Sequence, residues 1–257
     1  MPYWERPPDS RLAAYVERIS FSTDPVGKAS LPIRVIPDGR IDLLVSVDDR
    51  GAGRADVFGL KTGPLIVHSD ERVANIALTF RPGAASALLG VRANELTDRS
   101  LAAGALLGAE VIERLLDAPD LRTRSLLLEA ALLARVAASA SASKGDALVL
   151  QAAARIERRA GQIRVAELAA ELGVGERRLE RAFCAHVGVG PKTFARIARF
   201  RAAWRALERG GRPVEVALAH GYFDQPHLVR DFVAFAGAAP RRIFPSRAPV
   251  RPASLGA

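Results

Sequence analysis

The two stretches that decide the fold are residues 165–191, VAELAAELGVGERRLERAFCAHVGVGP, and residues 213–240, PVEVALAHGYFDQPHLVRDFVAFAGAAP, which are two copies of one pattern. Two pairs of residues match at an offset of 48 and five more match at 49: Ala169/Ala217 and Gly173/Gly221, then Leu179/Leu228, Arg181/Arg230, Phe183/Phe232, Gly188/Gly237 and Pro191/Pro240. The offset changes in the turn, where an inserted residue is tolerated best. Each copy predicts a helix-turn-helix unit, over residues 165–188 and 213–237.

The first copy has the small and apolar residues that two crossing helices need. One face of its first helix carries Val165, Leu168, Ala169 and Leu172. Gly173 is expected to end this helix in the left-handed backbone conformation, which residues with a side chain adopt only at a cost. Leu179, Ala182 and Phe183 are expected to anchor the second helix in the core.

The side chains left outward on the second helix of each copy are the predicted DNA contacts. They are Arg177, Arg178, Glu180 and Arg181 in the first copy, and Gln225, His227 and Arg230 in the second. Arg181 can grip guanine with two hydrogen bonds, Glu180 can accept one from cytosine, and Gln225 can pair with adenine. Asp224 is the predicted N-cap, and Pro226 falls in the first turn, where its missing N–H costs little. Since the outward residues differ, each copy is expected to read a different half of an asymmetric site.

A long basic helix, Phe194–Arg209, is expected to join the two units. Ile197, Phe200, Ala203 and Trp204 would face inward, while Arg196, Arg199 and Arg205 remain for water or phosphate. A rigid connector fixes the spacing of the two reading helices. Entry into successive major grooves on one face of a duplex requires about 34 Å between them, and a shorter spacing requires bent DNA.

The positive charge is concentrated in the half of the chain that holds the repeat. Residues 1–143 carry 17 Lys and Arg against 18 Asp and Glu, whereas residues 144–257 carry 20 against 10. A basic half joined to a neutral half is typical of a nucleic-acid-binding domain attached to another domain. There is no apolar run long enough to span a membrane and no apolar signal core at the N-terminus, so the sequence predicts a cytoplasmic protein with no membrane partner.

The first part of the chain predicts a small β-structure. Apolar and polar residues alternate over 41–47 and 74–80, which indicates half-buried strands. Val57–Leu60 and Leu65–His68 are shorter candidate strands, and turn signals rich in glycine and proline separate them all. Several short strands at this spacing favour an antiparallel barrel or sandwich.

Helices are expected from residue 84 onward. The candidates before the linker are Ala84–Leu89, Glu110–Asp117 and Leu121–Ala138. The last has an apolar stripe (Leu126, Leu127, Ala130, Leu133 and Ala134) that packs either on its own barrel or on a second copy of the chain. Ser139–Asp146 is the predicted linker, and Leu148–Arg159 a helix that Gly161 ends.

The fold class is therefore α+β. An N-terminal barrel or sandwich with accessory helices, residues 1–143, precedes an all-α domain, residues 144–257, with two helix-turn-helix units joined by a long helix.

The sequence shows no constellation typical of catalysis or metal binding. His68 stands alone in the N-terminal half, and His186 and His220 fall inside the helix-turn-helix units. The single cysteine, Cys184, excludes an internal disulfide and follows a residue expected in the core. Neither a nucleophile with its base nor a phosphate-binding glycine loop is evident, so no cofactor, metal or catalytic residue is predicted. Arg34 and Arg81 could line a pocket that binds an anionic effector, although both are expected to be exposed turn residues.

Residues 147–247 resemble the DNA-binding domain of AraC/XylS-type transcriptional regulators. The second copy carries the family's stretch, an Ala-x-x-x-Gly-Tyr turn followed by DQPHLVRDF and a closing Gly-x-x-Pro. The resemblance implies seven helices, and it implies DNA contacts from Arg177, Glu180 and Arg181 and from Gln225, Pro226, His227 and Arg230. Gly190 and Ala239 depart from the family, which usually has Ser or Thr there, so a slightly weaker cap on the following helix is expected.

Residues 1–143 resemble, more loosely, the N-terminal domain of a subgroup of this family. The similarity rests on IPDGRIDLLV at 36–45, FRPGAASALLG at 80–90 and NELTDRS at 94–100. That domain is a small cupin-like barrel used for sensing or dimerisation, and the resemblance supplies no ligand.

These observations predict a one-component transcription regulator and not an enzyme. Double-stranded DNA is its expected partner, and a small-molecule effector, RNA polymerase and a second copy of the chain are further candidates. One alternative is a metal-dependent or other enzyme in the barrel with a regulatory DNA-binding tail. A second alternative is a helical module that binds protein instead of DNA.

Overall fold

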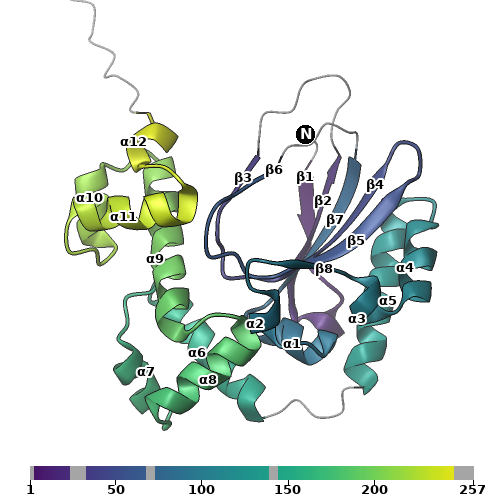
Figure 1. The fold of residues 1–257 in the computed structure, drawn as a ribbon, viewed down its shortest axis with the longest axis horizontal. Helices are drawn as coiled ribbons and strands as arrows, with labels where there is room; N and C mark the ends of the chain where they lie inside the picture. Colours follow the sequence, from purple (N-terminus) through teal and green to yellow (C-terminus); the bar gives the residue numbers. More distant parts are fainter. Residues whose placement is uncertain (1–2, 24–32, 68–72, 139–143, 246–257) are drawn as a thin grey trace, which may run out of the picture.

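The computed structural model describes residues 3–23, 33–67, 73–138 and 144–245. A twisted β-sheet with helices at its lower end and side forms the N-terminal part, and a group of helices forms the C-terminal part (Figure 1). The helix α6 leads from one part to the other and lies beside α8 near the base of the sheet (Figure 1). The α+β class predicted from the sequence is thus confirmed.

The strands form two antiparallel sheets. The larger has the order β1-β2-β7-β4-β5-β8, and a second sheet pairs β3 with β6. The strands span Tyr3–Arg6 (β1), Val16–Thr23 (β2), Ile33–Val35 (β3), Asp42–Asp48 (β4), Gly53–Phe58 (β5), Leu65–Val67 (β6), Val73–Phe80 (β7) and Ser100–Ala102 (β8). Since β1 and β8 are edge strands, the larger sheet is open and is not a closed barrel.

The alternation of apolar and polar residues correctly predicted which side chains of the central strands β4 and β7 are buried. In β4 the side chains of Leu43 and Val45 are buried, and in β7 those of Ile76, Leu78 and Phe80 are buried. These two strands pair with each other along their whole length, and β2 pairs with the other side of β7. The predicted strand at Leu65–His68 is β6, although His68 itself lies outside the described residues.

Helices lie at the lower end of the sheet and beside it (Figure 1). In the described residues before 139 they are a 3-10 turn at Ser10–Leu12 and the helices α1 (Ala84–Leu89), α2 (Ala93–Leu96), α3 (Gly104–Leu107), α4 (Ala109–Leu116) and α5 (Leu121–Ala138). The buried residues of α5 are Ser125, Leu128, Glu129 and Leu132. The apolar stripe was predicted to pack either on the barrel or on a second copy of the chain. Leu126 is 56% exposed and Ala130 and Ala134 are also exposed, so these three residues do not pack on the sheet. The buried face instead carries Glu129, which forms an ion pair with Arg6 at 2.6 Å.

Seven helices make up the described C-terminal part, as the family resemblance implied. They are α6 (Lys144–Arg158), α7 (Val165–Glu171), α8 (Glu176–Val187), α9 (Pro191–Glu208), α10 (Pro213–Ala219), α11 (Gln225–Ala236) and α12 (Pro240–Ile243). Gly173 has φ +65°, which confirms the left-handed end of α7. The predicted linker was too long by three residues, because α6 already begins at Lys144; residues 139–143 lie outside the described part.

The two parts share one apolar contact zone. The helical core is built on aromatic residues of α9 and α11, with Phe200 and Phe232 in edge-to-face contact at 4.9 Å between ring centroids. Leu60, which follows β5, is fully buried in this helical core. The N-terminal part therefore contributes to the packing of the helices that carry the repeat.

No helix in the described ranges is long and apolar enough to cross a membrane.

Candidate nucleic-acid interface

Helix α8 presents its cationic side chains to solvent at its N-terminal half. Leu179 and Phe183 are fully buried and hold the helix against the core. Between and beside them, Arg177, Arg178 and Arg181 are exposed. Because the N-terminal part of a recognition helix is the part that reaches base edges, these three arginines have the placement that the sequence predicted.

The predicted base reader Glu180 is also exposed, but its carboxylate packs on the start of α9. A Cβ built on Gly190, the N-cap of α9, would lie 2.1 Å from Oε1 of Glu180. A carboxylate is stabilised at the N-terminus of a helix by the helix dipole. Glu180 thus occupies the space of the side-chain cap that Gly190 lacks, which favours a structural role for this residue over cytosine recognition.

Helix α11 begins as the sequence predicted. The Asp224 carboxylate accepts a hydrogen bond of 2.7 Å from the backbone N–H of His227, which confirms Asp224 as the N-cap. Pro226 and Arg230 are exposed and Gln225 is partly exposed. These side chains occupy the start of the helix, so the second unit repeats the arrangement of the first.

His227 is held inside the unit. Its Nδ1 accepts a 3.4 Å hydrogen bond from the backbone N–H of Phe223, and its ring packs edge-to-face on Tyr222. Its Nε2 lies 3.4 Å from the guanidinium of Arg199. The base-reading role predicted for His227 competes with these contacts, and the geometry favours a role in shaping the turn.

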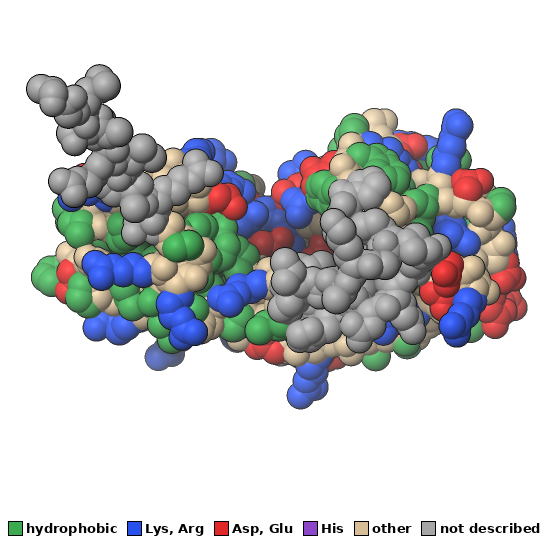
Figure 2. All heavy atoms as spheres, turned by 90° about the horizontal axis from the view of Figure 1, so that it is seen from above, with side chains coloured by type: hydrophobic (Ala, Val, Ile, Leu, Met, Phe, Trp, Pro, Cys, Tyr) green, Lys and Arg blue, Asp and Glu red, His purple; other side chains and the backbone are tan. Residues whose placement is uncertain are grey.

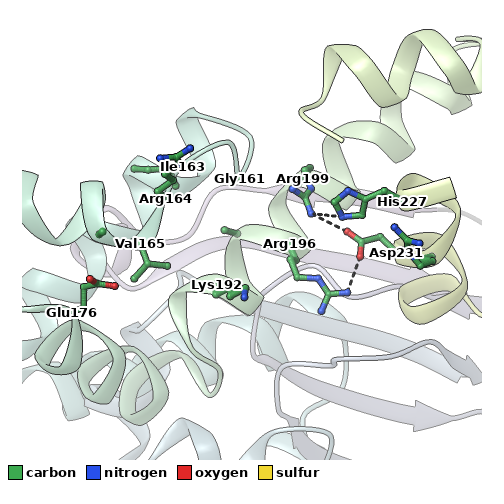
Figure 3. A pocket seen from close by; sticks show the side chains of 13 residues that line it. Gly161, Ile163, Arg164, Val165, Glu176, Lys192, Arg196, Arg199, His227 and Asp231 are labelled. Atoms are coloured by element: carbon green, nitrogen blue, oxygen red, sulfur yellow. Dashed lines mark hydrogen bonds and ion pairs between the residues drawn. The ribbon is translucent and has the colours of Figure 1, made fainter. Parts of the chain in front are cut away.

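Arg199, the phosphate contact predicted from the sequence, is held by neighbouring side chains. Its side chain is 16% exposed, its guanidinium lies 3.3 Å from the buried carboxylate of Asp231, and it stacks 4.5 Å above the ring of Tyr222. Arg196 completes this cluster with a 2.7 Å ion pair to the same carboxylate (Figure 3). Helical spacing shows which face of α9 is outward, but it does not show that an acid on a neighbouring helix pairs with Arg199, and this pairing favours a structural role for Arg199.

A cleft of about 840 Å³ lies between the two helix-turn-helix units. Its lining comes from the start of α7 and α8, from α9 as the floor, and from the N-terminal half of α11 (Figure 3). The charged residues that line it are Arg164, Lys192, Arg196, Arg199 and Arg230 against Glu176 and Asp231. Arg196 and Arg199 share the carboxylate of Asp231. The three remaining cations outnumber the one remaining acid, so the cleft carries a net positive charge that suits a polyanion.

The surface around these helices is mixed in character. In Figure 2 the molecule has two lobes with a hollow between them. Lys and Arg side chains are spread over the lobe at the left, where Figure 1 places α10 and α11, and hydrophobic side chains lie between them. This surface combines charge for phosphates with apolar groups for base edges.

The N-terminal part holds both recognition helices by their C-terminal ends. At the end of α8, the hydroxyl of Ser86 donates to the carbonyl of His186 at 3.2 Å, and that of Thr97 donates to the carbonyl of Gly188 at 2.8 Å. At the end of α11, Arg34 donates to the carbonyl of Ala236 at 2.5 Å. The last carbonyls of a helix have no partner within the helix, so these contacts both satisfy them and fix the helix ends.

A buried ion cluster forms the second contact between the parts. Arg40, whose side chain is 7% exposed, lies 2.6 Å from the Glu17 carboxylate and 2.7 Å from that of Glu157 on α6. Burial alone would raise the pKa of Glu17, but the Arg40 guanidinium outweighs it and the pKa is lowered. Gly39 packs against the ring of Phe194, where a Cβ would come within 2.7 Å. The turn that contains Gly39 and Arg40, within the segment 36–45 that resembled the family's N-terminal domain, thus contacts both α6 and α9.

The remaining candidates have structural placements. Arg81 is an exposed turn residue whose Nε donates to the carbonyl of Ala13 at 2.7 Å. Burial, together with the Glu180 charge, raises the pKa of the Cys184 thiol, which disfavours the reactive thiolate. Burial lowers the pKa of His220. Within the described ranges, no three side chains of His, Cys, Asp and Glu gather as a metal site would require.

Sequence reasoning missed the residues that connect the parts and the helices. Ser86, Thr97 and Arg40 contact residues of the C-terminal part that are 91 to 117 positions away in sequence, beyond any local pattern. Asp231 could have been found, because a carboxylate between Leu228 and Phe232 on the apolar face of α11 requires a cationic partner.

Two family models match the chain. Residues 168–245 match a helix-turn-helix domain, and residues 5–102 match a domain of unknown function, DUF6597. No curated protein matches the chain.

Solved structures of ToxT from Vibrio cholerae are similar to the chain at low identity. ToxT from strain O395 is 13% identical, with 87% of this chain and 96% of that chain covered and a TM-score of 0.44. Wild-type ToxT from strain SCE256 bound to an unsaturated fatty acid is 12% identical, with 93% and 96% covered and a TM-score of 0.44.

The matched residues 168–245 contain both units of the repeat and the connecting helix. The exposed arginines of α8, the cap of α11 and the basic cleft lie within or beside this range. Residues 168–245 therefore form a helix-turn-helix domain, as their resemblance to the DNA-binding domain of AraC/XylS-type regulators predicted.

Proposed function

We propose that the chain is a one-component transcription regulator whose helices α8 and α11 enter successive major grooves on one face of a duplex. The observation that carries this proposal is the position of the basic cleft between the N-terminal halves of the two helices. A duplex read by both helices must pass its sugar-phosphate backbone across the floor that α9 forms. Lys192 on α9, together with Arg164 and Arg230 on the two walls, would neutralise those phosphates.

The two helices read different sequences. The exposed arginines of α8, Arg177 and Arg181, favour guanine-containing steps, whereas Gln225 of α11 favours adenine beside the Arg230 contact. Each copy of the chain therefore binds an asymmetric site. A palindromic operator arises only if two copies bind together.

The N-terminal part, residues 1–143, acts as the sensing or dimerising domain of the regulator. Its contacts with the C-terminal ends of α8 and α11 support a route by which a small-molecule effector alters DNA binding. The exposed face of α5, with Leu126, Ala130 and Ala134, supports contact with a second copy of the chain. RNA polymerase is the partner through which a bound regulator acts on transcription.

Selection of bound duplexes from a random library tests the proposal. We expect one enriched asymmetric motif with two readable parts separated by about one helical turn. The affinity for that motif should fall steeply with salt, with a slope set by the number of phosphates contacted. Recovery of no motif, together with no duplex binding at low salt, would contradict the proposal. Repeating the selection with candidate small molecules then shows whether an effector changes the affinity.

A further inference from the structure

The two helix-turn-helix units differ in length by one residue, and the structure identifies that residue. In the first unit the backbone N–H of Val174 donates to the carbonyl of Ala169, and in the second the N–H of Tyr222 donates to that of Ala217. These equivalent bonds are 48 residues apart. The next equivalent positions, the helix N-caps Gly175 and Asp224, are 49 apart. Phe223 is therefore the extra residue of the second unit.

The extra residue is an aromatic side chain exposed to solvent. Phe223 is 88% exposed, the highest value among the exposed large hydrophobic side chains of the described residues. Its neighbour Tyr222 is 3% exposed and belongs to the core, in the place that Val174 takes in the first unit. The insertion thus adds no packing to the domain, and it places an apolar ring outside it.

The backbone that carries this ring is well held. The N–H of Phe223 donates to Nδ1 of His227, and the next residue, Asp224, caps α11 through its carboxylate. The ring of Tyr222 packs edge-to-face on that of His227, with 5.1 Å between the ring centroids. The guanidinium of Arg199 stacks over the ring of Tyr222, 4.5 Å from its centroid. The backbone of Phe223 therefore has a fixed position at the N-terminus of α11, directly before the N-cap Asp224.

We propose that Phe223 is a specificity-determining residue that contacts the methyl group of a thymine in the major groove. This inference rests on the proposed function, since it requires α11 to enter that groove. The N-terminal end of a recognition helix faces the base edges, and thymine is the base that offers an apolar group there. The first unit has no equivalent side chain, so only the half-site read by α11 contains the methyl-dependent position.

Replacing thymine with deoxyuridine tests the contact, because this change removes only the methyl group. Each thymine of a selected duplex is replaced in turn, and binding of the full-length chain and of Phe223→Ala is measured. We expect one position at which deoxyuridine weakens binding of the unchanged protein by about three- to tenfold. At that position Phe223→Ala should bind the thymine and deoxyuridine duplexes equally.

A matched control is available on α10, where Leu218 is 66% exposed but belongs to the helix that does not read bases. Leu218→Ala should keep the deoxyuridine effect in full. Thermal unfolding of Phe223→Ala should equal that of the unchanged protein, since the ring contributes nothing to the core. This result separates a lost contact from a damaged fold.

Several outcomes would overturn the assignment. They are an equal deoxyuridine effect in Phe223→Ala and the unchanged protein, the absence of any methyl-sensitive position, and a uniform loss of affinity of Phe223→Ala for all duplexes. The last would assign the ring to the sugar-phosphate backbone. Failure of the full-length chain to bind any duplex would instead overturn the proposed function as a whole, so the two failures are distinguishable.

Discussion

The guanidinium of Arg40 lies 2.7 Å from the carboxylate of Glu157, and this ion pair joins the turn before β4 to helix α6. The same guanidinium lies 2.6 Å from Glu17 on β2. A buried cation between two carboxylates from different parts of the chain is sensitive to the loss of any member, because an unpaired buried charge is costly.

Arg40→Ala should lower the free energy of unfolding of the full chain by about 1–2 kcal/mol, since it leaves the partly exposed carboxylates of Glu17 and Glu157 without their shared partner. Chemical denaturation measures the change. Arg54→Ala is the control, because Arg54 is 75% exposed and lies 3.8 Å from Asp56, and its loss should cost less than about 1 kcal/mol. Equal effects of the two variants would show that the cluster contributes little to stability.

Asp42 makes stability depend on pH in the opposite sense to most acids. Burial, followed by the nearby charge of Asp38, raises the pKa of Asp42 from 3.8 to about 6. Below pH 3.8 the carboxyl is protonated whether the chain is folded or unfolded, and its burial carries no charge penalty. Above pH 6 it is ionised in both states, and the folded state carries the penalty. The contribution of Asp42 to stability therefore falls as the pH rises from about 4 to 6.

Asp42→Asn should raise the free energy of unfolding at pH 7.5 by roughly 1–3 kcal/mol and leave it nearly unchanged at pH 4. The amide oxygen can still accept the 2.6 Å hydrogen bond from the hydroxyl of Thr79. Urea denaturation at the two pH values measures both numbers, with Asp49→Asn on the exposed turn as the control. A gain that is equal at both pH values would show that ionisation of Asp42 is not its cause.

Arg181→Ala should cost about 1–3 kcal/mol at its target base pair and relax the base preference there, because a bidentate contact to guanine is lost. Competition binding against duplexes that differ at each position measures this. Arg114→Ala, an exposed arginine of α4 far from the cleft, should change neither affinity nor preference. An unchanged preference of Arg181→Ala would remove Arg181 from the reading role.

Arg199→Ala should lower the melting temperature by several degrees, since it removes the ion pair to the buried Asp231 and the stack on Tyr222. Arg205→Ala, an exposed residue on the same helix, should leave the melting temperature unchanged. If Arg199→Ala instead keeps its stability and weakens binding to every duplex equally, the phosphate contact expected from the sequence is the correct assignment.

The features that follow local periodicity could be predicted from the sequence. The bounds of α1 and α5, the phase of β4 and β7 and the turn glycine of each helix-turn-helix unit are set by residues within a few positions of each other. The strand β2 was not predicted, although it is an inner strand of the larger sheet, between β1 and β7. Its buried residues, Val16, Ile19, Ser20 and Phe21, do not alternate strictly, because the pairing with β7 shifts register between Val16 and Arg18.

The sequence predicted the placement of site residues whose exposure depends only on their own helix. It did not predict the placement of residues that pair with a side chain distant in sequence. Arg177 and Arg181 are exposed, as the helical spacing of α8 predicted. Arg199 looked the same in sequence, yet Asp231 from α11 covers it. Likewise, the sequence did not show which face of α5 is buried, because Glu129 on that face pairs with Arg6, more than a hundred residues away.

The bonds from Ser86, Thr97 and Arg34 to the last carbonyls of the two recognition helices place a pivot at the end of each helix farthest from its DNA-reading tip. Each helix is then a lever: at about 1.5 Å per residue, twelve residues give an arm of about 18 Å, and a tilt of roughly 10° moves the tip by about 3 Å. That displacement is close to the rise of about 3.4 Å between neighbouring base pairs. A tilt of about 10° around these contacts would therefore move the helix tip by about one base step along the duplex.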